Sequence, residues 1–325
     1  MASGLAGLYK VQMGVETTWG TTVAATAKHY AEKIAGLRNA QNFVQAVERR
    51  GSLAMSRRSY LPRNQIEGLG FEGEVTFEDL PFWLGMALKA AVKTGAGPYV
   101  YTHTPSTSAA NTPSFYSCEF GDNVQAFLAG GMLAKSLELS GKEGEAWKFK
   151  AETFAQSLAT TTFTAALTDR TVIPALAEMT ILYMDDTGGT IGTTQKTATL
   201  IDWTWKVSEH FYPQFYQDGS LNAAQYGEKP FRPELELTVG FNSGANTLRT
   251  KYAAGTRQLV RLKVTGASGR IIQLDGAYII TEDPLILDER EGGETICKLK
   301  LMAEYDSTDA LYCSAVVTNN VSALP

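Results

Sequence analysis

The chain has 325 residues, of which 44% are hydrophobic and 19% are charged, as expected of a soluble globular protein. This length predicts about two domains of roughly 150 residues each. The formal net charge of −5 argues against a general nucleic-acid binder, which needs an excess of Lys and Arg to neutralise phosphates.

No targeting or metal signal stands out. Cys118, Cys297 and Cys313 are far apart and predict reduced, buried thiols rather than a disulfide framework or a zinc site. The segment 1–7 lacks the basic and apolar regions of a signal peptide. Because no apolar run approaches the about 18 residues of a membrane helix, we expect no membrane association.

The first half of the chain reads mainly as β structure. Residues 1–30 predict an extended N-terminal arm. The first convincing strand runs from Phe71 to Phe77, where apolar and polar residues alternate. Asp79 then predicts a helix cap. The polar stretch 95–114 predicts a long loop with a short strand near Tyr99.

The second half begins after about residue 165. Trp203 and Trp205 share one face of an alternating strand and predict core positions. The strand 235–241 alternates most cleanly. A helix is expected from Ser243 to Tyr252, with Gly255 as its stop.

The two halves repeat one another. Arg50-Gly51-Ser52-Leu53 is echoed by Asp218-Gly219-Ser220-Leu221, and each is followed by an alternating strand and a helix signal. Leu137-Glu138-Leu139 is echoed by Leu285-Ile286-Leu287, and the second copy lacks a counterpart of the stretch 95–114. An insertion confined to a loop is expected of true duplication, so we predict two tandem domains, 1–165 and 166–325.

No catalytic constellation is visible. His29, His103 and His210 lack metal-site spacing and predict surface or loop positions. There is no nucleophile elbow, dinucleotide fingerprint or phosphate-binding loop. The acidic stretch 282–294 lacks the spacing of a calcium loop and predicts a solvated hairpin or a subunit contact. We therefore expect no cofactor, no metal and no enzymatic activity.

Two segments suggest contacts with other copies of the chain. Arginine pairs well with carboxylates, so a basic cluster predicts docking on acidic neighbours rather than a phosphate grip. The cluster comprises Arg49, Arg50, Arg57, Arg58 and Arg63. The aromatic segment 211–216 predicts a partly exposed patch of the kind found at subunit contacts.

Several motifs together resemble the tail tube (major tail) proteins of bacteriophages with long non-contractile tails. They are Trp19-Gly20-Thr21, Arg49-Arg50-Gly51-Ser52, the run from Glu72 to Leu84, and the segment from Tyr99 to Ser106. The resemblance covers most of the chain and is strongest over residues 15–165.

This resemblance implies a mainly β fold with two tandem β-sandwich domains, each flanked by a short helix. Sheets of neighbouring subunits would join edge to edge into a channel-lining β-barrel, which removes unpaired edges. Two fused copies imply trimeric, pseudo-hexameric rings that stack into a tube in the virion tail, assembled in the host cytoplasm. The implied partners are the chain itself and the tape measure, tail tip and tail terminator proteins, with DNA passing without specific binding.

The expected sites follow from these surfaces. The polar faces of the best alternating strands are candidates for the lumen, where net negative charge would repel DNA weakly. They comprise Glu72, Glu74, Glu234, Glu236 and Thr238. The arginine cluster and residues 95–114 are candidates for contact between rings.

Other classes of function remain open at this point. A carbohydrate- or receptor-binding β-sandwich module would use segment 211–216 as its platform. A capsid decoration protein or a ring-forming tail-completion protein would form rings that do not polymerise.

Overall fold

The computed structural model describes residues 4–36, 38–48, 51, 53, 56–197, 199–241, 243–284, 287–290 and 293–324. Over these residues the fold is mainly β, as predicted, with two α-helices, α1 (Leu80–Ala87) and α2 (Ser243–Ala254). Short 3-10 turns lie at η1 (Ala6–Leu8), η2 (Ala177–Met179) and η3 (Ala267–Gly269).

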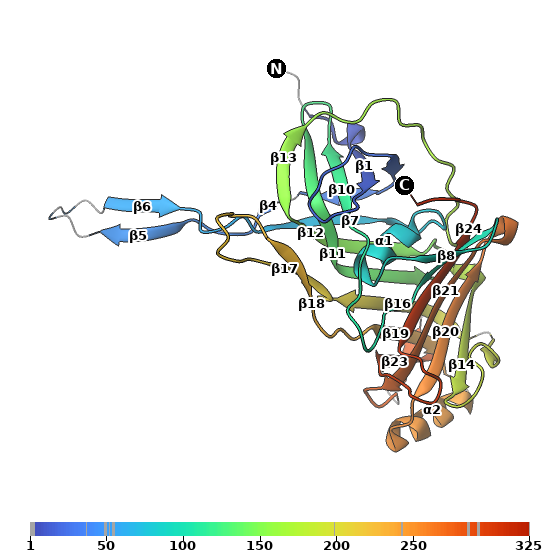
Figure 1. Cartoon of the computed structure of the whole chain (residues 1–325). Coiled ribbons are helices and arrows are strands. Elements are labelled where there is room, and N and C mark those ends of the chain that lie inside the picture. The colour runs from blue at the N-terminus through green and yellow to red at the C-terminus, as the bar shows by residue number, and fades with distance from the viewer. Residues whose placement is uncertain are drawn as a thin grey trace.

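The strands fall into two successive sets (Figure 1). The first set is β1 (Lys10–Val15), β2 (Ala27–His29), β3 (Lys33–Ala35), β4 (Arg38–Asn39), β5 (Val44–Glu48), β6 (Ser56–Tyr60), β7 (Ile66–Glu74), β8 (Val92–Thr94), β9 (Tyr99–His103), β10 (Tyr116–Gly121), β11 (Ala126–Lys142), β12 (Lys148–Ala155) and β13 (Ser157–Thr161). The second set is β14 (Thr180–Asp186), β15 (Gln195–Lys196), β16 (Leu200–Ser208), β17 (Phe211–Gln214), β18 (Gln225–Glu228), β19 (Glu234–Gly240), β20 (Gln258–Thr265), β21 (Ile271–Ile280), β22 (Leu287–Arg290), β23 (Glu294–Ala303) and β24 (Cys313–Asn319).

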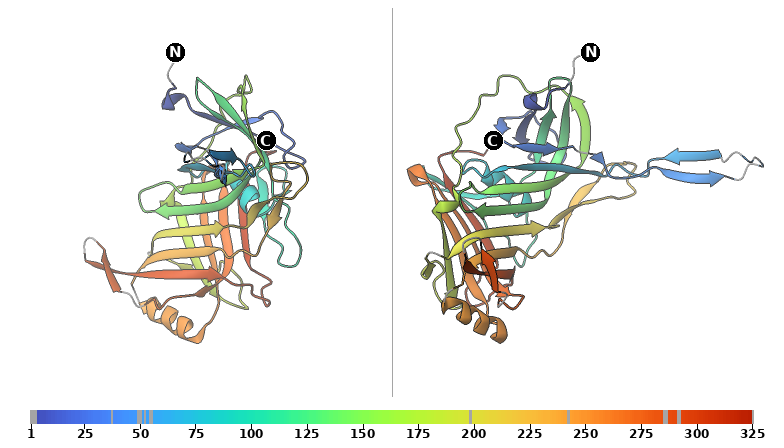
Figure 2. Two further views of the ribbon diagram at one scale, coloured as in Figure 1. Left: turned by 90° about the vertical axis from the view of Figure 1, so that its left-hand side faces the viewer. Right: turned by 180° about the vertical axis from the view of Figure 1, so that it is seen from behind.

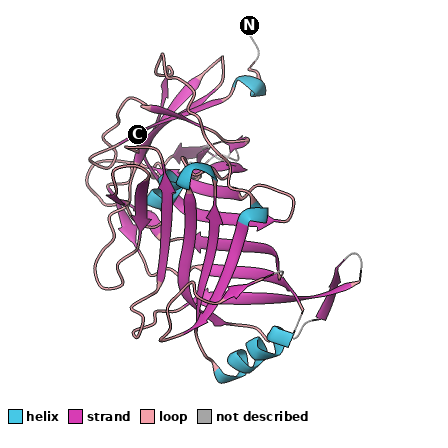
Figure 3. Cartoon of the chain, turned by 90° about the vertical axis from the view of Figure 1, so that its right-hand side faces the viewer, coloured by secondary structure: helices cyan, strands magenta, loops and turns pink. Residues whose placement is uncertain are grey.

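One antiparallel sheet, which we call the shared sheet, runs through both halves. Its order is β3 and β4, then β7, β12, β11, β16, β19, β23 and β22. The halves meet where β11 pairs with β16. The left view of Figure 2 shows its strands stacked side by side, and Figure 3 shows the chain from the opposite side. Over the described residues the sheet stays open rather than closing into a barrel.

A second layer covers each half of the shared sheet. In the first half it runs β2, β1, β10, β11 and β13, and in the second half β15, β14, β20, β21 and β24, with β9 and β8 added at its edge. β11 is long enough to pair in both layers of the first half. The apolar sides of the layers form one continuous core, so each half is a β-sandwich.

The strand pairings of the two halves correspond. β1–β10 matches β14–β20, β7–β12 matches β19–β23, and the hairpin β5–β6 matches the hairpin β17–β18. Each helix follows its corresponding strand, α1 after β7 and α2 after β19. This shared topology is what duplication predicts; the domain limits 1–165 and 166–325 stay predictions.

The predicted core residues are largely where the sequence placed them. Trp203 and Trp205 are buried, as are the three free cysteines. The helix α2 ends just before Gly255, whose positive φ suits a glycine, as expected. Asp79 precedes α1 but makes no side-chain cap, because its carboxylate is bound by other partners.

The short strand predicted near Tyr99 is confirmed as β9, and it adds to β24 of the second half. Two other expectations from the sequence are wrong. Residues 10–15 form β1, paired on both sides, rather than lying in an extended arm. His29, His103 and His210 are buried, because each ring packs against aromatic or backbone groups rather than facing solvent.

Candidate assembly surfaces

The outward face of the shared sheet carries charges of alternating sign. One row of directly opposed residues crosses six strands from β3 to β19, and lysine and glutamate alternate along it: Lys33, Glu72, Lys150, Glu138, Lys206 and Glu234. Directly opposed charges of opposite sign stabilise a sheet by about 0.2–1 kcal/mol per pair. We call this face the charge lattice.

Local geometry supports the pairing in the lattice. Lys33 Nζ lies 3.1 Å and Lys150 Nζ 3.8 Å from the carboxylate of Glu72. The hydrogen bond and charge of Lys33 lower the pKa of Glu72, so its carboxylate is ionised at neutral pH. In the next row Glu74 opposes Lys148, and Glu236 opposes Lys300.

The predicted lumen residues therefore share one face of one sheet. Glu74, Glu234 and Glu236 are exposed and Glu72 is half-buried, while Thr238 is only 7% exposed and adds little surface. Their assignment to a lumen stays a prediction.

The expected net negative character is wrong for this face. The lysines were visible in the sequence, but only the register of the strands shows that they stand opposite the glutamates.

The hairpin β5–β6 projects away from the sandwich (Figures 1 and 2). Large apolar side chains on it are exposed, with Phe43 at 64%, Tyr60 at 54% and Leu53 fully exposed. Isolated two-stranded hairpins are at best marginally stable in water, so such a hairpin gains stability from a partner surface.

Two of the predicted ring-to-ring arginines lie on this hairpin, and Arg63 follows it. Arg49 and Arg50 lie outside the described residues, and Arg57 and Arg58 lie on β6 with side chains that are not described. Arg63 bonds to the side-chain oxygens of Gln41 and Gln65, and its guanidinium lies 4.5 Å from the centre of the Phe215 ring. Arg63 thus joins the two halves within one chain.

The aromatic segment 211–216 is divided between core and surface. Phe211 is fully buried, and Arg63 covers the ring of Phe215. Tyr212 and Tyr216 are exposed, so only part of the predicted patch is present at the surface.

A group of buried charges follows β7 and joins it to distant segments. Arg270 Nε lies 2.6 Å from Glu78 Oε1, and the other carboxylate oxygen of Glu78 accepts the backbone N–H of Ile173. Asp79 binds Arg170, and its Oδ1 lies 3.3 Å from Nδ1 of His29.

The same burial shifts the pKa of two members of the group. Burial lowers the pKa of His29 more than Asp79 raises it, so the ring is neutral at pH 7. Burial alone would raise the pKa of Asp79, but His29 and Arg170 outweigh it and lower that pKa. Ion pairs hold the group together, while both ring nitrogens of His29 and Nη1 of Arg170 are buried without a hydrogen-bond partner.

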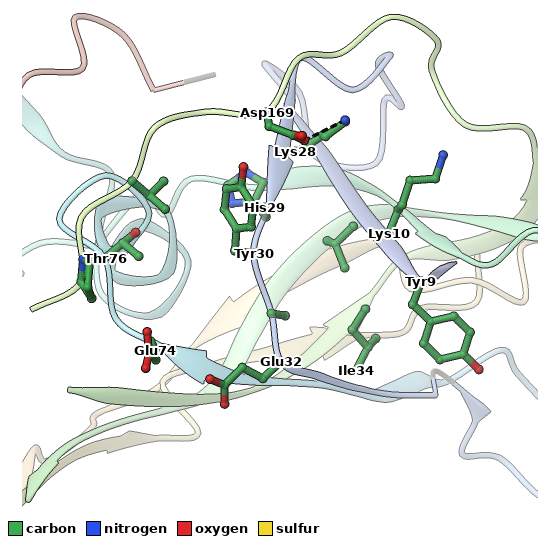
Figure 4. A pocket seen from close by; sticks show the side chains of 14 residues that line it. Tyr9, Lys10, Lys28, His29, Tyr30, Glu32, Ile34, Glu74, Thr76 and Asp169 are labelled. Atoms are coloured by element: carbon green, nitrogen blue, oxygen red, sulfur yellow. Dashed lines mark hydrogen bonds and ion pairs between the residues drawn. The ribbon is translucent and has the colours of Figure 1, made fainter. Parts of the chain in front are cut away.

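A pocket of about 480 Å³ lies beside β3, with Glu32 and Ile34 on its lining (Figure 4). The ion pair between Lys28 and Asp169 spans 2.9 Å at its wall. Over the part of the chain that the structure describes, no group of three or more His, Cys, Asp or Glu side chains is arranged to hold a metal ion. Among the same residues no helix has the length and apolarity needed to cross a membrane.

These features define a mainly β protein in which one face of a sheet carries charges of alternating sign. The family model for phage tail tube proteins matches residues 10–295, and the chain belongs to that family. Its role is therefore that of a structural component of a phage tail. Among curated proteins, no sequence matches this chain.

Proposed function

We propose that copies of this chain assemble into trimeric rings with pseudo-sixfold symmetry, and that the rings stack into a tube through which the genomic DNA leaves the virion. The observation that carries this proposal is the shared sheet, in which two equivalent units already stand side by side through the β11–β16 pairing. Three copies supply six such units. Closure into a ring pairs the edge strands that a single chain leaves open.

The charge lattice is the surface we assign to the channel. Opposite charges alternate along its row from Lys33 to Glu234, so DNA meets a surface that neither binds it tightly nor repels it strongly. Passage without specific binding follows from this local neutrality rather than from net negative charge. The tape measure, tail tip and tail terminator proteins are proposed partners of the tube, on the strength of family membership alone.

Charge reversal in the lattice tests the channel assignment. The double variant Glu72→Lys, Glu234→Lys places lysines side by side on the face, which attracts phosphates and should slow DNA ejection while tubes remain intact. The measurement is tube yield by electron microscopy, followed by the rate of DNA release from particles.

The matched control changes the same face in the opposite direction. The double variant Lys150→Glu, Lys206→Glu should leave ejection near the unmodified rate, because added negative charge does not bind DNA. Unchanged ejection in the glutamate-to-lysine variant, with normal tubes, would place the lattice outside the channel.

Contact between rings through Arg49, Arg50, Arg57 and Arg58 remains a proposal. It draws support from the place of Arg57 and Arg58 on a projecting hairpin. Segment 104–114 supports it less, because Asn111 bonds to Glu228 within the same chain.

A further inference from the structure

The chain contains one junction between its two equivalent halves. β11 pairs with β16 in antiparallel register from Ser136 opposite Ser208 to Lys142 opposite Asp202. Each of these strands ends its own half of the shared sheet, so the junction joins two sheet edges.

The hairpin β17–β18 crosses this junction and lies on the first half. Phe211 packs with Phe115, Leu133 and Phe154 in a separate buried cluster. Near the tip, the carbonyl of Leu221 accepts the backbone N–H of Asn64 at 2.7 Å. The second half thus contacts the first half in two ways, through the β11–β16 pairing and through the packed hairpin β17–β18.

The corresponding hairpin of the first half has no such surface within the chain. The alignment that places Gly51 on Gly219 also places Phe43 on Phe211 and Leu53 on Leu221, and the two hairpins end at corresponding residues, Tyr60 and Glu228. Phe211 is fully buried, whereas Phe43 is 64% exposed. The phenylalanine at this position of the repeat is therefore buried against the other half in one case, Phe211, and exposed to solvent in the other, Phe43.

The two outer edges of the shared sheet match the two strands of the internal junction. β22 corresponds to the end of β11, because both pair with the strand that follows them, and β3 with β4 corresponds to β16. The edge strands also carry opposite net charge. Lys33 and Arg38 lie on one edge, and Asp288, Glu289 and Arg290 lie on the other. Such complementarity favours joining one edge to the other.

The correspondence between the two halves also indicates which surface the β5–β6 hairpin would contact. Asn64, which receives the docked hairpin, stands two residues before β7, and Arg232 stands two residues before the equivalent strand β19. Phe231, the residue before Arg232, lines an open pocket of about 540 Å³ together with Glu228, Tyr305 and Tyr312. An apolar and aromatic pocket suits a side chain such as Leu53.

We propose that the contact between neighbouring copies repeats the internal junction. The β5–β6 hairpin of one copy docks on the second half of the next, with Leu53 at the pocket beside Glu228 and Phe43 buried at its base, while β3 and β4 lie beside β22. The inference rests on the proposed ring and names the surfaces that close it. It concerns the apolar side chains of the hairpin; the arginine contact between rings is a separate proposal.

A cysteine pair tests this contact directly. The double variant Leu53→Cys, Lys229→Cys places thiols on the hairpin and beside the pocket, at positions that are both exposed in the single chain. The native cysteines are buried, so under native conditions only the new thiols are accessible. Oxidation should link copies covalently, and the ladder on a denaturing gel should stop at three copies because the ring closes.

The matched control is the double variant Leu53→Cys, Thr256→Cys, which keeps the hairpin thiol and moves its partner to another exposed position of the same half. It should not form the ladder. A second variant, Phe43→Ser, should lose ring assembly while its monomer melts at the unmodified temperature.

The outcomes separate this inference from the proposed ring. Rings seen by microscopy without a link between positions 53 and 229 overturn the contact and leave the ring standing. A ladder that continues without limit shows that the hairpin joins successive rings, which also overturns it. Absence of both rings and links overturns the contact and the proposed function together.

Discussion

The two halves of this chain share a strand order and differ in what they bury. In the first half α1 is buried along its whole length and the hairpin is uncovered. In the second half the hairpin is docked, and the described side chains of α2 from Thr247 onward are exposed or half-buried. Because the chain contains two copies of one unit, the contact between its halves indicates how its uncovered hairpin and sheet edges could contact another copy.

The two halves differ most clearly at the corresponding phenylalanines of their hairpins, Phe211 and Phe43. Phe211→Ala should lower the free energy of unfolding of the monomer by about 3–5 kcal/mol, because it empties a buried aromatic site. Phe43→Ala should change it by no more than about 0.5 kcal/mol, because that ring is exposed. Urea unfolding of both variants at a concentration that keeps the protein monomeric provides the measurement. Equal losses would show that the two hairpins are not used differently.

The buried charges after β7 include an ion pair between the two halves, which can be compared with an exposed pair within the second half. Glu78→Ala leaves Arg270 buried without its carboxylate, which should cost about 3–5 kcal/mol. The exposed pair between Glu209 and Lys229 is the control, since Glu209→Ala should cost about 1 kcal/mol or less. Thermal unfolding followed by circular dichroism measures both. A Glu78 variant as stable as the Glu209 variant would contradict a structural role for the ion pair.

The buried histidines predict acid sensitivity of a smaller size. Burial lowers the pKa of His103 to about 4, against an ordinary value of 6.5. As the pH falls from about 6.5 to about 4, the unfolded chain takes up a proton that folded His103 does not. The free energy of unfolding therefore decreases over this range, by about 3 kcal/mol at most, and the contribution is constant above it.

The variant His103→Gln isolates this effect. Urea unfolding at pH 7 and pH 4.5 should show a smaller loss of stability in the variant than in the unmodified protein. An identical loss in both would mean that other groups carry the acid sensitivity.

Much of the fold could be predicted from local patterns. Alternation located β7, β16 and β19, and the helix signals located α1 and α2, since amphipathic periodicity directly reflects which face is buried. β1 escaped detection because four consecutive residues in it are buried, which removes the alternation. The burial of His29 and Asp79 could not be foreseen, because their partners come from distant segments.

The surfaces were harder to predict than the core. Candidate glutamates were placed correctly on one face, yet the lysines opposite them change its character from acidic to neutral. Cross-strand register decides this, and register depends on turns and bulges such as the shift in β11 between Ala134 and Ser136. Likewise, Phe43 and Phe211 are the same residue type in the same repeat position, and only the structure shows that one is covered.

Negative-stain electron microscopy of the purified protein over a concentration series tests the central claim most directly. The account predicts hollow tubes or rings whose end views show threefold or pseudo-sixfold symmetry, with rings lost in the Phe43→Ser variant. Compact monomers at every concentration, even with a tail-tip nucleator added, would contradict it.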